Sequence, residues 1–73
     1  MSKHYFSFGQ MHTHRLNGVT LDCDGILCVE AKNSDVARKK VFDLIGNKFA
    51  FQYTEETLKL KYFPRGVVLT LEA

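Results

Sequence analysis

The stretch ILCVEAKNSDVARKKVFDLIGN, residues 26–47, decides the fold because it joins a strand pattern to a helix pattern over a very short connection. In its first part the side chains alternate, so that Leu27, Val29 and Ala31 share one face of an extended chain and the residues between them share the other. We therefore predict a strand over residues 26–31, with at least one face in the core.

The second part of the stretch carries the start, spacing and stop signals of an α-helix. Asn33 and Ser34 are natural N-caps, and Asp35 places an anion where the helix dipole favours one. Gly46 and Asn47 form a common helix end. The spacing predicts a helix over residues 34–45 with an apolar face made of Ala37, Val41, Leu44 and Ile45. Its exposed face carries Arg38, Lys39 and Asp43.

Aromatic residues at alternate positions predict two more strands. Residues 4–10, HYFSFGQ, place Phe6 and Phe8 on one face. Residues 48–53, KFAFQY, alternate three aromatic side chains, which we expect to pack beneath the helix: Phe49, Phe51 and Tyr53.

The C-terminal part of the sequence predicts a β-hairpin. LKLKYF, residues 58–63, and VVLTLE, residues 67–72, both alternate, and PRG between them reverses the chain with Pro64 at the second turn position. The side chains predicted to face inward are Leu58, Leu60, Tyr62, Val67, Leu69 and Leu71.

These patterns together predict an α+β fold in a single small domain, residues 1–73. We expect an antiparallel sheet of about four to five strands with the helix 34–45 packed on one face. Residues 11–25 contain two glycine-bearing polar stretches around a short VTL, which indicates a long loop or an irregular hairpin connection.

Size and composition favour a binding protein over an enzyme. With 73 residues, the chain has little surface from which to form a water-excluding pocket. The net charge of +2 is far from that of a strongly basic nucleic-acid binder. No apolar run approaches the roughly 18 residues needed to span a bilayer, and we expect a cytoplasmic protein with reduced thiols at Cys23 and Cys28.

His12 and His14 raise the possibility of a metal site, because alternate residues of an extended segment point the same way. Further donors are close in sequence, namely His4, Asp22, Cys23 and Asp24. The spacing matches no established zinc pattern, and DCDG, residues 22–25, lacks the later oxygen ligands of a calcium loop. We expect a turn at DCDG, with an aspartate accepting backbone N–H bonds and glycine supplying an unusual φ. We expect no bound metal and no cofactor.

The chain contains cysteines, histidines and aspartates, the residue types used in nucleophilic catalysis. Nothing in the sequence indicates that these side chains lie close together. We therefore expect no enzymatic activity. Two binding interpretations remain. Nucleic-acid binding would combine the aromatic segment HYFSF with dispersed cations: Lys3, Arg15, Lys59, Lys61 and Arg65. Protein binding would use a patch near the first strand, made of Lys3, His4, Tyr5 and Arg15.

The segments HYFSFGQMHTH, VEA, ARKKVFDLIGNKFAFQY and YFPRG together resemble small bacteriophage proteins, and the resemblance covers nearly the whole chain. The chain is also similar in length to small transcription regulators of Xanthomonas phages that bind and inhibit host RNA polymerase. This resemblance implies a non-enzymatic phage protein that binds host RNA polymerase and occludes or displaces a partner. A bacterial defence complex is the alternative target. The resemblance assigns no role to any individual residue.

Overall fold

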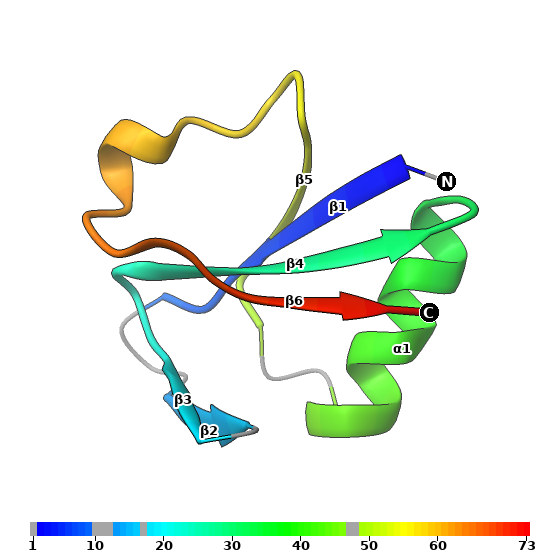
Figure 1. The fold of residues 1–73 in the computed structure, drawn as a ribbon, viewed down its shortest axis with the longest axis horizontal. Helices are drawn as coiled ribbons and strands as arrows, with labels where there is room; N and C mark the ends of the chain where they lie inside the picture. The colour runs from blue at the N-terminus through cyan, green and yellow to red at the C-terminus, as the bar shows by residue number, and fades with distance from the viewer. Residues whose placement is uncertain (1, 10–12, 17, 47–48) are drawn as a thin grey trace.

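The computed structural model describes residues 2–9, 13–16, 18–46 and 49–73, and the following elements lie within them (Figure 1). The strands are β1 (Ser2–Ser7), β2 (His14–Leu16), β3 (Val19–Leu21), β4 (Gly25–Ala31), β5 (Phe51–Thr54) and β6 (Gly66–Glu72). The helices are α1 (Ser34–Ile45) and the short 3-10 helix η1 (Leu60–Tyr62). The predicted α+β class is confirmed.

Four strands form the main sheet, in the order β5-β1-β4-β6. β1 runs antiparallel to both β4 and β5, whereas β6 runs parallel to β4. The sheet is therefore mixed, and the expectation of a purely antiparallel sheet is wrong for β6. β2 and β3 form a separate antiparallel hairpin, which is the irregular connection expected between residues 11 and 25.

The main core lies between the sheet and the layer formed by α1 and the β2–β3 hairpin (Figure 1). Phe6 pairs with Leu27 across β1 and β4, and both side chains are fully buried. The other buried members of this cluster are Phe8, Leu21, Val29, Ala31, Ala37 and Val41. Burial of these apolar groups provides most of the driving force for folding.

α1 has the predicted bounds. Asn33 is the N-cap, and its side-chain oxygen accepts a hydrogen bond from the Val36 amide at 2.9 Å. Gly46 ends the helix with a φ of 69°, a conformation that favours glycine. Ala37 and Val41 are buried as expected. Leu44 is 41% exposed, so the prediction that it belongs to the buried face of the helix is wrong.

The segment expected as a strand over residues 48–53 is a strand only from Phe51, and Lys48 lies outside the described residues. Phe49 lies next to the helix, where its ring meets Phe6 edge-on at a centroid distance of 5.1 Å. Phe51 and Tyr53 lie on the opposite face, in register with Ser7 and Tyr5. The expectation that all three aromatic side chains pack beneath α1 is therefore wrong.

Residues 58–63 do not form a strand. This segment ends in η1, Tyr62 is 65% exposed, and the connection from β5 to β6 passes on the side of the sheet away from α1 (Figure 1). The turn at PRG is present, with the Gly66 amide donating to the Phe63 carbonyl at 2.8 Å. It leads into β6 as the parallel neighbour of β4, instead of closing the predicted hairpin.

The predicted alternation of β6 is interrupted by a register shift. Ile26 of β4 pairs with Val67, and the next residue, Leu27, pairs with Leu69, so that Val68 is an additional residue in β6. Val68 consequently joins Leu69 in packing against the main core, while Val67 is 41% exposed. The expectation that Val67 faces inward is wrong because the bulge changes the phase of the strand.

The DCDG turn has the predicted hydrogen bonds but not the predicted glycine conformation. The Asp24 amide donates to the Asp22 side chain at 3.0 Å, and the Gly25 amide donates to the Asp22 carbonyl at 3.2 Å. Gly25 does not supply an unusual φ; instead, a Cβ at this position would lie 3.2 Å from a methyl carbon of Val68. A side chain at position 25 would therefore crowd Val68 of β6, and this close approach favours glycine.

Candidate binding surfaces

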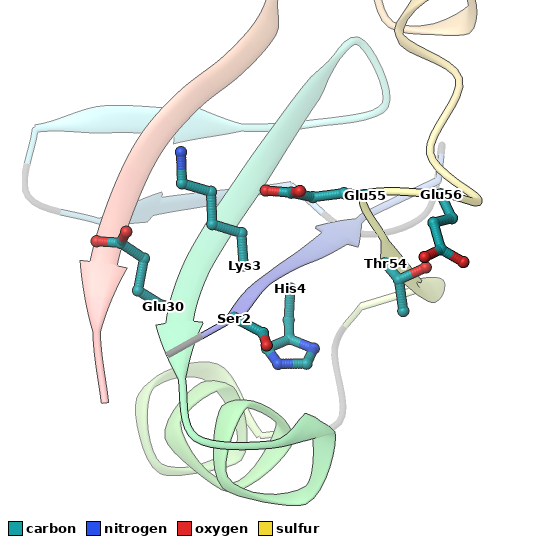
Figure 2. A pocket seen from close by; sticks show the side chains of 7 residues that line it. All are labelled: Ser2, Lys3, His4, Glu30, Thr54, Glu55 and Glu56. Atoms are coloured by element: carbon teal, nitrogen blue, oxygen red, sulfur yellow. The ribbon is translucent and has the colours of Figure 1, made fainter.

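A notch of about 470 Å³ lies at the edge of the sheet beside the start of β1 (Figure 2). β5 pairs with β1 only from His4 to Ser7, so that Ser2 and Lys3 extend beyond Thr54, the last residue of β5. We call this hollow the acidic notch. The residues that line it are Ser2, Lys3, His4, Glu30, Thr54, Glu55 and Glu56.

A tight turn positions two of the acidic side chains. The Thr54 amide donates to the Thr57 hydroxyl at 2.9 Å, and the Thr57 amide donates back to the Thr54 carbonyl at 3.2 Å. Glu55 and Glu56 lie between these threonines and are held at the rim of the notch. The sequence signal for this turn is the short TEET stretch, residues 54–57, because its threonines can form such local hydrogen bonds.

His4 is the most unusual polar residue of the notch. Its side chain lies on the helix side of β1, opposite in direction to Lys3 (Figure 2), and the residue is only 6% exposed. Neither Nδ1 nor Nε2 has a hydrogen-bonding partner among the described residues. Buried polar groups are nearly always hydrogen-bonded, so an imidazole with two unpartnered nitrogens requires an explanation.

The charge around the notch is mainly negative. Lys3 is the register partner of Glu30 across β1 and β4, and Glu55 and Glu56 add two further carboxylates. Burial raises the pKa of the Tyr5 phenol, and Cys28 and Glu55 nearby raise this pKa further. Tyr5 is therefore a neutral hydrogen-bonding group beside these acids.

The structure does not gather the four residues of the predicted binding patch on one surface. Lys3 and Tyr5 lie on the sheet face away from α1, whereas His4 is buried on the other face. Arg15 is exposed, but it belongs to β2, where it pairs with Thr20 in the separate hairpin. Strand alternation divides the four residues between two faces and a separate hairpin, and Glu30 is the register partner of Lys3, so their role in partner binding stays a prediction.

A second hollow, of about 260 Å³, lies where the β5–β6 connection meets β5. Tyr53 and Phe63 form one wall, with their ring centroids 6.4 Å apart. The Lys61 ammonium lies 5.1 Å from the centroid of the Tyr62 ring. We call this hollow the aromatic cleft. It is lined by Tyr53, Thr57, Lys59, Tyr62 and Phe63.

The two cysteines are free thiols with little nucleophilic character. Burial raises the pKa of Cys28, which is 2% exposed. Desolvation also raises the pKa of Cys23, and the carboxylate of Asp24 adds to this shift. Since the thiolate is the reactive form, both environments disfavour nucleophilic chemistry at neutral pH.

The residues considered for a metal site are not assembled into one within the described part of the chain. There, no group of three or more histidine, cysteine, aspartate or glutamate side chains is placed to hold an ion. The ring of His14 lies edge-on to the ring of Phe8, with the two ring centroids 6.0 Å apart. His12 lies outside the described residues.

Comparison with known proteins leaves the fold and its surfaces as the basis for assigning function. No family model, curated protein or solved structure matches this chain. Within the described residues, no helix has the length and apolar character needed to cross a bilayer.

Proposed function

We propose that this protein is a non-enzymatic phage regulator that binds bacterial RNA polymerase of the host and inhibits transcription. The observation that supports a binding role is the aromatic cleft, in which Tyr62 remains 65% exposed beside two lysines. Tyrosine is enriched among the residues that dominate binding energy at protein interfaces, because it combines a large apolar ring with a hydroxyl. The choice of polymerase rests on the sequence resemblance to small phage proteins.

The proposed mechanism is occlusion or displacement. The aromatic cleft provides an anchoring surface, and the compact body around it blocks a polymerase surface needed by the promoter-specificity subunit or by DNA. The protein acts in the cytoplasm of the host bacterium. A bacterial defence complex is the alternative target under the same binding mechanism.

Binding to purified polymerase tests the proposal directly. We expect immobilised protein to retain the core enzyme or the holoenzyme, and to reduce RNA synthesis in a promoter-dependent assay with purified components. Tyr62→Ala should weaken binding by about 30-fold if Tyr62 is an anchor, corresponding to roughly 2 kcal/mol. Val36→Ala, an exposed apolar position on α1, is the control and should leave binding unchanged. Absence of binding at micromolar polymerase would refute polymerase as the target.

Arg15 remains a predicted contact residue, and the same assay tests it. Arg15→Ala should weaken binding about fivefold or more if the hairpin also contacts the partner. Lys39→Ala on α1 is the matched control, because Lys39 is exposed. Arg38 is unsuitable as a control, since its guanidinium lies 5.6 Å from the Phe42 ring centroid and 5.7 Å from that of Phe49.

A second candidate function is binding of single-stranded nucleic acid at the same cleft. Aromatic rings can stack on bases, and Lys59 in the cleft and Lys61 beside Tyr62 can contact phosphates. The nearby glutamates of the acidic notch and the small net charge favour a protein partner over this alternative. Titration with a labelled single-stranded oligonucleotide distinguishes the two, because phosphate binding weakens steeply with added salt. Salt-sensitive binding that is lost in Lys59→Gln would favour nucleic acid.

A further inference from the structure

We infer that the acidic notch is a docking site for an extended, basic segment of a protein partner. This surface adjoins the aromatic cleft but is lined by different residues, and the inference does not depend on polymerase being the partner. Three features of the notch support it, namely an open strand edge, an unsatisfied buried imidazole and an excess of carboxylates.

The open strand edge comes from the unequal lengths of β1 and β5. Because β5 pairs with β1 only from His4 onward, Ser2 and Lys3 have no strand neighbour on that side among the described residues. A strand with an unpaired edge can bind an extended chain through backbone hydrogen bonds. The notch is therefore suited to a segment of peptide lying alongside the start of β1.

His4 supplies a polar group whose two ring nitrogens have no hydrogen-bonding partner among the described residues. The imidazole is 6% exposed and lines the notch, with Thr54 as its register partner on β5. A neutral imidazole offers one N–H donor and one acceptor nitrogen. A bound segment can hydrogen-bond to these nitrogens, which recovers the cost of burying them without partners.

The carboxylates determine the charge of the expected segment. The turn between Thr54 and Thr57 holds Glu55 and Glu56 in place. Glu30 belongs to β4, and Lys3 of β1 lies between it and Glu55 (Figure 2). The lining therefore contains three carboxylates and a single ammonium group. Lysine or arginine side chains complement this arrangement, whereas an acidic segment would be repelled.

The test uses a blocked peptide of alternating alanine and lysine, titrated into the isotope-labelled protein at near-physiological ionic strength. We expect saturable NMR shifts of the Lys3 and Glu55 amides and of the His4 ring protons. A blocked peptide of alternating alanine and glutamate is the matched control and should cause none. Spermidine tests whether free polyamine charge is sufficient. Equal binding of spermidine, or shifts that leave His4 unaffected, would overturn the inference.

Two variants locate the interaction. Glu55→Gln should weaken binding of the lysine peptide roughly threefold to fivefold, whereas Asp43→Asn, which removes the same charge from the exposed face of α1, should not. His4→Leu should also weaken binding, with the Lys3 amide as the reporter. Unchanged binding in both notch variants would refute the site, and it would leave the proposed role of the aromatic cleft unaffected.

Discussion

At position 4 an imidazole lies between Val29 of β4 and Thr54 of β5 on the helix side of the sheet. Its neighbours Phe6 and Val29 are fully buried apolar residues. A leucine would fit this environment without leaving two nitrogens unpartnered. Positions at which a sequence departs from the requirements of its core are often used for function, and here that function is the proposed docking of a basic segment.

His4→Leu should therefore stabilise the protein while weakening its binding of the lysine peptide. We expect the free energy of unfolding in urea to rise by about 1–3 kcal/mol, because the cost of burying unpartnered polar groups is removed. Phe6→Ala, two residues along the same face, is the control and should lower it by about 3–5 kcal/mol. A loss of stability in His4→Leu would show that the imidazole is satisfied in the folded protein.

The two free cysteines differ in burial, and thiol labelling can detect this difference. In the native protein iodoacetamide should modify Cys23 before Cys28, because Cys23 is half-buried and Cys28 is buried. The pKa of each thiol is raised, so both reactions should be slow at neutral pH and accelerate as the pH rises and thiolate forms. Mass spectrometry of digested samples measures the order. Faster modification of Cys28 would contradict the packing described for β4.

Among the elements, the β2–β3 hairpin is held against the main sheet by Arg65. Its guanidinium donates to the Thr20 carbonyl at 2.8 Å and to the Asp22 carboxylate at 3.2 Å, and its backbone amide donates to the Asp24 carbonyl at 2.9 Å. The sequence alone suggested Arg65 as a phosphate contact. In the structure this residue connects the hairpin to the beginning of β6.

Arg65→Ala should loosen the hairpin more than it destabilises the whole fold. We expect faster amide hydrogen exchange at Thr20 and Leu21, with a loss of only about 0.5–1 kcal/mol, because the ion pair is partly exposed to solvent. Lys61→Ala, an exposed cation in η1, is the control and should leave hairpin exchange unchanged. Equal exchange in Arg65→Ala and wild type would show that apolar packing alone holds the hairpin.

The elements with local signals were predictable from the sequence, and those defined by distant partners were not. Asn33 and Gly46 mark the helix ends within a few residues of the apolar pattern, so α1 was predicted correctly. The alternation in residues 58–63 is equally regular, but nothing local shows that η1 forms there or that β6 pairs with β4. The acidic notch depends on the register of His4 with Thr54, about fifty residues away, which no short pattern contains.

For the whole molecule, one core cluster connects the sheet, α1 and the hairpin. Leu21 from β3, Leu27 from β4 and Val41 from α1 belong to the same buried cluster. Small domains with a single core usually unfold cooperatively. We expect urea unfolding curves from circular dichroism and from tyrosine fluorescence to coincide. Separate transitions would contradict this, and they would indicate that the hairpin unfolds independently.

The parallel pairing of β4 with β6 also affects how the chain is made. Gly25 and Gly66 are register partners about 40 residues apart, so the ribosome completes β4 long before β6 has been synthesised. Until β6 forms, the edge of β4 that β6 later covers has no strand beside it. Such edges pair readily with other chains. We therefore expect the chain to be most prone to aggregation before residues 66–72 pair with β4, and this exposure ends once β6 has formed.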